Sequence, residues 1–136
     1  MTERQKVDDV IAQLEAHVER WKNFNRFINK ARARQSSEDD EMAFLECKSV
    51  ILQELEVICA AFESGAPNKD DIRAIINNAP SIRSMGEMND NSLRALESSW
   101  HKVFGDWQTI LGQLKVRQRQ MASESSGFFG KLFGKR

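Results

Sequence analysis

Only a few side chains of this sequence combine the types and the spacing that acid–base or metal chemistry requires. Its 136 residues include two histidines, His17 and His101. Glu97 lies four positions before His101, whereas the metal-binding helices of di-iron bundles place a glutamate three positions before a histidine. We therefore interpret Glu97 and His101 as a solvent-facing pair on one helix. An enzyme that works through them is a third hypothesis, and it requires a concave pocket around both side chains.

Other catalytic and cofactor-binding patterns are absent from the sequence. No group of cysteines and histidines has zinc-ligand spacing, and there is neither a glycine-rich phosphate loop nor a Gly-x-Ser-x-Gly elbow. Asp70 and Asp71 fit the first turn of a helix, where acidic side chains interact favourably with the helix dipole. Cys47 and Cys59 are separated by about 18 Å in one expected helix, beyond disulfide reach. We expect a non-enzymatic protein with no catalytic residues, no metal and no cofactor.

The most unusual feature is the terminal segment, residues 128–136, with the sequence Phe-Phe-Gly-Lys-Leu-Phe-Gly-Lys-Arg. Phe-Gly-Lys occurs twice in it at an interval of four residues, so a helical conformation would align the aromatic side chains. Glycines 127, 130 and 134 each cost a helix about 1 kcal/mol relative to alanine, so we expect the free segment to be disordered and to fold on contact. The residues expected to dock on a partner or a membrane are Phe128, Phe129, Lys131, Leu132, Phe133, Lys135 and Arg136.

Three interpretations of the terminal segment stay open. It can lie in an anionic membrane surface, because aromatic and basic side chains suit the interface. It can fill a pocket on a protein partner, or it can cover an apolar groove of its own chain. Burying its phenylalanines and its leucine gives roughly 6–12 kcal/mol, and ordering its backbone costs about 9–18 kcal/mol. One segment therefore binds weakly, and display on an oligomer would strengthen binding.

A row of basic side chains indicates a second kind of partner. Residues 20–34 carry six basic side chains and no acid, and such a cluster can bind nucleic-acid phosphates. The alternative, which we favour, is pairing within the chain, because residues 38–71 carry ten acids and two lysines and a helical hairpin would place them nearby. The basic row consists of Lys22, Arg26, Lys30 and Arg34, with Lys115, Arg117 and Arg119 as further candidates for nucleic-acid contact.

Tryptophans and glycines repeat at intervals of seven residues in the last long helix that the sequence predicts. They are Trp100, Gly105, Trp107 and Gly112. Large and small residues at this spacing can form a self-association seam, and ordinary close packing within the chain explains the same pattern. Two helices of about 45 Å also offer more apolar surface than one short helix covers. We therefore expect a homo-oligomer.

Apolar residues at intervals of three and four predict two long helices in the first half of the chain. The first covers residues 7–34. The second begins after Ser37, which resembles a capping pair with Asp40, and it ends at Gly65-Ala66-Pro67, because glycine suits the position after a helix and proline prevents continuation. The apolar row of the first helix is Val7, Ile11, Leu14, Val18, Trp21 and Ile28.

The second half of the chain predicts a short helix, a loop and a long helix. Asn68 can cap the short helix, which stops near Pro80. Residues 81–91 are predicted to form a loop, and the long helix starts at residue 91 or 92. Its spacing fades over residues 116–121, and residues 122–127 are typical of a flexible linker. The loop residues expected to cover one end of the core are Ile82, Met85 and Met88.

These patterns together predict an all-α fold, an antiparallel helical bundle of three long helices plus one short helix with a flexible C-terminal tail. Residues 1–122 would form the bundle domain, and residues 123–136 the linker and the docking tail. The 20 basic and 20 acidic side chains cancel, so the whole molecule should not be drawn to nucleic acid or anionic lipid. No apolar run has the length of a spanning helix or the form of a signal peptide, so we expect a cytoplasmic location, with attachment to a membrane periphery as the alternative.

The functional expectation is an interaction or adaptor protein. It would self-associate and attach to a membrane surface or a larger protein assembly through residues 128–136. The alternative is a nucleic-acid-binding accessory protein that uses the basic row.

Overall fold

The structure, a computed structural model, describes residues 2–62 and 67–132, and within these ranges it is helical with no strand. The all-α class is therefore confirmed. None of the described helices is both long and apolar enough to cross a lipid bilayer. The elements are α1 (Glu3–Arg32), α2 (Glu38–Ala60), α3 (Lys69–Asn77), α4 (Ile82–Gly86) and α5 (Asp90–Leu132).

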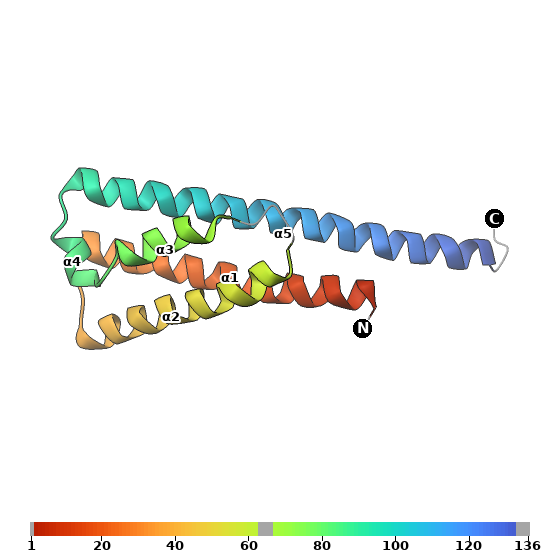
Figure 1. Ribbon diagram of the computed structural model, residues 1–136, viewed down its shortest axis with the longest axis horizontal. Helices are drawn as coiled ribbons and strands as arrows, with labels where there is room; N and C mark the ends of the chain where they lie inside the picture. The colour runs from red at the N-terminus through yellow and green to blue at the C-terminus, as the bar shows by residue number, and fades with distance from the viewer. Residues whose placement is uncertain (1, 63–66, 133–136) are drawn as a thin grey trace.

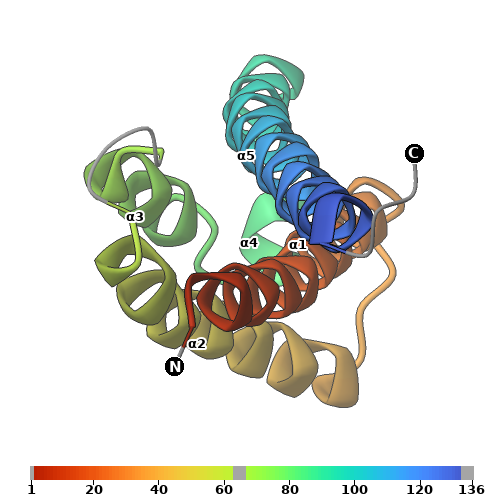
Figure 2. The same cartoon turned by 90° about the vertical axis from the view of Figure 1, so that its right-hand side faces the viewer.

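Helix α1 lies at the centre of the arrangement. It packs against α2 and α5 along its length and against α4 at one end (Figure 1). Seen along the long axis, α3, α2, α1 and α5 follow one another around an arc (Figure 2). Helix α4 lies behind them, at the end of the molecule farther from the viewer. Helix α3 contacts α2 and also α5, which closes the arc, and α1 contacts both α2 and α5.

Side-chain caps fix where the helices begin. Thr2 and Gln5 cap each other's backbone N–H at the start of α1, with distances of 3.1 and 2.9 Å. The predicted capping pair of Ser37 and Asp40 is confirmed, with both distances 3.1 Å, and Asn68 caps α3 as predicted. Because of the cap at Thr2, α1 begins at Glu3, earlier than the predicted start at Val7.

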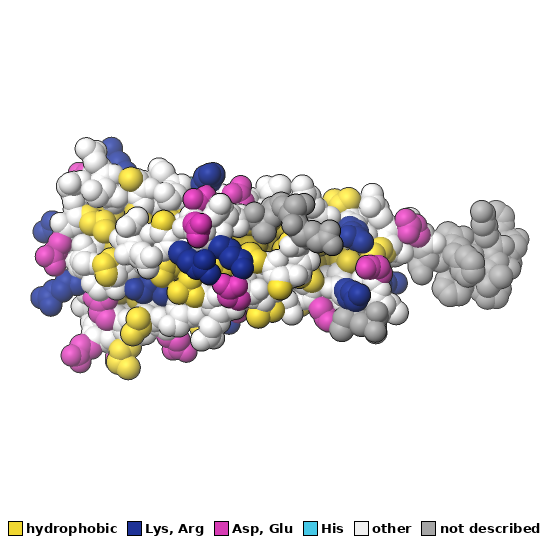
Figure 3. Space-filling view, viewed as in Figure 1, with side chains coloured by type: hydrophobic (Ala, Val, Ile, Leu, Met, Phe, Trp, Pro, Cys, Tyr) yellow, Lys and Arg dark blue, Asp and Glu magenta, His cyan; other side chains and the backbone are white. Residues whose placement is uncertain are grey.

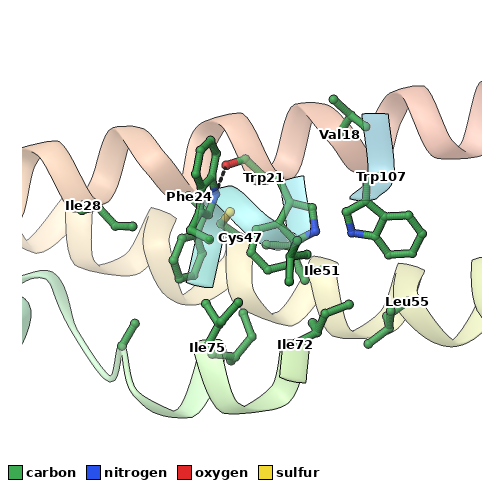
Figure 4. Packing of buried hydrophobic residues seen from close by; sticks show 14 of the residues in the cluster. Val18, Trp21, Phe24, Ile28, Cys47, Ile51, Leu55, Ile72, Ile75 and Trp107 are labelled. Atoms are coloured by element: carbon green, nitrogen blue, oxygen red, sulfur yellow. Dashed lines mark hydrogen bonds between the residues drawn. The ribbon is translucent and has the colours of Figure 1, made fainter. Parts of the chain in front are cut away.

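The predicted apolar rows form the core. Side chains from α1, α2, α3 and α5 point toward one another in Figure 4, and Trp21 and Trp107 have no exposed surface. The indole N–H of Trp100 donates to the backbone carbonyl of Trp21 at 2.9 Å. This bond fixes the register of α5 on α1, because a buried N–H left without an acceptor costs about 1–3 kcal/mol.

The prediction of a loop over residues 81–91 is wrong, because this segment contains helix α4. Ser81 and Ser84 cap each other's backbone N–H, and the carboxylate of Glu41 on α2 accepts the N–H groups of Ile82 and Arg83 at 2.8 and 3.0 Å. Short polar residues thus start a helix without an extended apolar row. Ile82 and Met85 are buried, and Met88 packs partly buried against the core, so the expected cover over the end of the core is present.

Two predicted helix ends differ from the structure. Helix α2 ends at Ala60, before the predicted stop, and residues 63–66 lie outside the described residues. Helix α5 continues through residues 122–127, where the sequence favours a linker, and ends at Leu132. The described side chains end at Glu124, and residues 133–136 lie outside the described residues. The mobility of the tail and the division of the chain at residue 122 stay predictions.

The buried ammonium group of Lys48 ties α2 to the connection between α3 and α4. Its Nζ donates to the carbonyl oxygens of Ala79 and Pro80 at 2.9 and 2.8 Å, and it lies 4.8 Å from the centre of the Phe44 ring. Helix α4 is therefore held from α2 by two side chains, Lys48 and Glu41.

We predict that Lys48→Met destabilises the chain by about 1–3 kcal/mol, because it removes the donor to the buried carbonyl oxygen of Ala79 and to the partly buried one of Pro80. Lys22→Met is the matched control. Lys22 is exposed and pairs only with Glu19 on its own helix, so this change should stay within about 0.5 kcal/mol. Urea unfolding followed by circular dichroism measures both values, and equal effects of the two substitutions would contradict the structural role of Lys48.

Candidate docking site

A groove of about 600 Å³ lies between α3 and α5. Its floor is apolar, formed by Ile75 of α3 and by Leu96 and Val103 of α5, all of which are buried. Figure 3 shows the face between α5 and the helices beneath it, where hydrophobic side chains are visible at the surface. The volume falls in the range of about 300–1,000 Å³ that is typical of ligand clefts.

Small side chains keep this groove open. Ser92, Ala95 and Ser99 line it from α5 at intervals of three and four, and Ala74 lines it from α3. Helix α3 is only nine residues long, so it covers a small part of the α5 face. The groove was missed by sequence reasoning, although the spacing of the small residues on α5 was a readable signal.

Acidic side chains stand on both walls of the groove. Asp71 lies on α3 and Asp106 on α5, and Lys102 of α5 also lines it. Neither carboxylate forms an ion pair with another described residue. The groove therefore combines an apolar floor with a rim that favours basic groups.

The structure places the terminal segment far from this groove. Helix α5 carries the backbone of residues 128–132 beyond the end of α1 at which the chain begins (Figure 1). The side chains of Phe128, Phe129, Lys131 and Leu132 are not described, and Phe133, Lys135 and Arg136 lie outside the described residues. The docking role of these seven residues stays a prediction.

The basic row is partly neutralised within the chain. Lys30 pairs with Asp40 at the start of α2, at 3.4 Å, which agrees with the expected hairpin pairing. Lys22 pairs with Glu19 on its own helix at 3.2 Å, and Arg26 donates to Asn23 at 2.8 Å. These contacts are exposed, so each contributes little stability.

The other basic candidates are dispersed. Arg34 follows α1 with a positive φ of 56°, and Lys115 and Arg117 of α5 pair with Glu15 and Glu3 at 3.3 and 3.9 Å. On the face shown in Figure 3, acidic and basic side chains are interspersed. Arg119 is exposed. Lys115 and Arg117 are thus paired with acids of α1.

The four residues of the expected self-association seam separate into two groups. Trp100 and Trp107 are buried in the core of their own chain, so they are not available to a partner, and this part of the seam hypothesis is wrong. Gly105 and Gly112 are exposed, and a Cβ added at either one would meet no atom within 4 Å. Close packing within the chain thus explains the tryptophans but not the glycines.

The residues considered for catalysis are not brought together in a pocket. Glu97 forms an ion pair with Arg32 at 2.9 Å, and exposed His101 stacks edgewise on Trp100 with ring centres 4.9 Å apart. Among the described residues, no three His, Cys, Asp or Glu side chains are grouped as metal ligands. Burial raises the pKa of the Cys47 thiol to about 11, which makes it a poor nucleophile at neutral pH.

The other histidine, His17, belongs to a buried hydrogen-bond network that sequence reasoning did not identify. His17 has no exposed surface, its Nδ1 lies 3.1 Å from Oε1 of Glu54, and its Nε2 lies 3.1 Å from the indole N–H of Trp21. Because an indole nitrogen only donates, Nε2 is the acceptor, and the proton sits on Nδ1. The signal was its position between Leu14 and Trp21 in the apolar row.

This geometry holds His17 in its neutral form. Burial lowers its pKa below the usual 6.5, although the hydrogen bond and the charge of Glu54 act in the opposite direction, and Arg20 lowers the pKa further. A protonated ring would lose the Trp21 hydrogen bond, because both of its nitrogens would then be donors. The Trp107 ring packs nearly perpendicular to the His17 ring, with ring centres 5.1 Å apart. His17 therefore packs in the core as a neutral ring, and its contribution to the free energy of unfolding depends on pH.

Compared with known proteins, the chain matches no family model, no curated protein and no solved structure. A function must therefore be argued from its own residues.

We predict that His17 makes the folded chain less stable as the pH falls from 7 to 5. The unfolded chain binds the proton near pH 6.5 and the folded chain only at lower pH, so stability is complete above the unfolded pKa and declines below it, by at most about 1.4 kcal/mol per pH unit. His17→Gln should flatten this decline, and His101→Gln, an exposed control, should retain it. Urea titrations at several pH values measure the slopes, and identical slopes for all three chains would contradict the assignment.

We predict that Gly105→Ala and Gly112→Ala each stabilise the chain by about 0.5–1 kcal/mol, because alanine favours an exposed helix and meets no neighbouring atom here. Thermal unfolding and analytical ultracentrifugation provide the measurements. Loss of a dimer in either variant would instead assign the two glycines to an interface.

Proposed function

We propose that this chain is a non-enzymatic interaction protein that self-associates and attaches to a protein assembly through its terminal segment, residues 128–136. The observation that carries the proposal is the course of α5, which continues to Leu132 beyond the end of α1 (Figure 1). An antiparallel bundle of the long helices α1, α2 and α5, completed by the short helices α3 and α4, would serve as the rigid base. Within this proposal the chain works in the cytoplasm.

The composition of the terminal segment supports a docking role. It combines four large apolar side chains with three basic ones and contains no acid. Because the backbone of residues 128–132 is already helical, the ordering cost on binding falls by about 1–2 kcal/mol for each of these residues. A helical presentation therefore makes the segment a stronger ligand than a free peptide of the same sequence.

An anionic membrane surface is the other binding partner that this composition suits. Each basic residue near such a surface contributes about 1 kcal/mol, and the attraction declines with added salt. We favour a protein partner because the three basic side chains are fewer than the clusters of about four to eight that mark lipid-binding segments.

The basic row supports the alternative, a nucleic-acid accessory role, less well. Two of its lysines already pair with acids of the same chain. Phosphate binding by the remaining side chains would decline steeply with salt, and binding by buried aromatic rings would not. A salt titration of any observed complex therefore separates the two functions.

We predict that deleting residues 127–136 changes the melting temperature by no more than about 2 °C, because α5 carries the backbone of residues 128–132 beyond the end of α1 (Figure 1). The same deletion should abolish copurification of protein partners. Phe128→Ser with Phe129→Ser, which keeps the length and the charge, should reproduce the loss, and Lys6→Ser with Gln120→Ser is the surface control. A large loss of stability would place the segment in the core, and unchanged copurification would place the attachment site elsewhere.

A further inference from the structure

We infer that the groove between α3 and α5 receives the terminal segment of a second copy of this chain. The inference rests on the proposed function, because it takes residues 128–136 as an attachment element, and it names their partner. The two surfaces would then belong to one self-associating pair.

The two surfaces are complementary in chemistry. The groove offers a floor of Ile75, Leu96 and Val103 for apolar side chains, and the terminal segment supplies three phenylalanines and a leucine. Small residues on the α5 wall let a bulky side chain or a helix backbone approach closely. Aromatic side chains are the usual anchors of such contacts, because each buries about 150–250 Å².

The charges are also complementary. Asp71 and Asp106 stand on opposite walls, and the salt bridges among the described residues include neither of them. Lys102 also lines the groove, so its lining keeps a net negative charge. The terminal segment brings Lys131, Lys135 and Arg136 without an acid. Opposite charges at the rim orient the incoming segment and disfavour acidic competitors.

The length of α5 excludes the groove of the same chain. Along a helix, Gly127 lies about 32 Å from Asp106, the nearest groove residue on α5. The nine residues that follow reach at most about 30–32 Å even when fully extended, so they would touch the rim and have no length left to lie in the groove. A terminal segment that lies in this groove must therefore belong to another copy.

A reciprocal exchange satisfies both copies at once. If each copy places its terminal segment in the groove of the other, the pair is symmetric, and both contacts form together. The second contact is then intramolecular, which raises the affinity well above that of one segment. This arrangement supplies the oligomeric display that a weakly binding segment needs.

The test is a charge exchange between the two surfaces of the full chain, with the dimer dissociation constant measured by sedimentation equilibrium. Asp71→Lys with Asp106→Lys should weaken dimerisation about tenfold or more, and so should Lys131→Glu with Lys135→Glu. Combining all four substitutions should restore the constant to within about threefold of the original, because the opposite charges are again paired. Asp9→Lys with Glu46→Lys, an equal charge change at exposed positions outside the groove, should have little effect.

The outcomes separate this inference from the proposed function. If the groove reversal leaves the dimer unchanged while deletion of residues 127–136 abolishes it, the terminal segment binds elsewhere, and the inference is overturned while the proposed function stands. A chain that stays monomeric up to about 100 µM, but sediments with phosphatidylserine vesicles through residues 127–136, overturns the inference in favour of a lipid surface. Restoration of the dimer only in the combined variant supports it, and it also shows that the chain folds with all four substitutions present.

Discussion

The contact between α1 and α5 is the constraint on which the rest of the structure depends. The indole N–H of Trp100 is bound to the backbone of Trp21, and the indole N–H of Trp21 is bound to His17. His17 in turn contacts Glu54 of α2. Three helices are thus joined by a chain of buried polar contacts within an apolar core, and satisfied networks of this kind specify one packing register.

That register has two geometric consequences. Because α5 has 43 residues and α1 has 30, α5 extends about 20 Å beyond what α1 can match. Because α3 is short and packs against α2 as well, the α5 face opposite it is incompletely covered, which leaves the groove that Asp71 and Asp106 border. A projecting end and an open groove therefore have one origin, the unequal lengths of packed helices.

The sequence predicts the helices that have a periodic apolar row and a local cap well. It predicts poorly the features that depend on residues distant in the sequence. The apolar rows and the caps at Ser37 and Asn68 are local signals, and both are confirmed. Helix α4 was missed because its start depends on Glu41, a residue 41 positions away, and the groove was missed because it depends on the length of α3. The glycine and serine content near residue 127 favoured a linker, whereas the structure continues the helix.

The central claim is that α5 carries the terminal segment away from its own chain. Electron–electron distance measurements between spin labels at Ser98→Cys and Ser126→Cys test it directly, in a chain with Cys47→Ala and Cys59→Ser and diluted with unlabelled protein. The account predicts one population near 42 Å, the length of a continuous helix between the two positions. A main population below about 25 Å would show that the segment folds back on the helices of its own chain and would contradict the account.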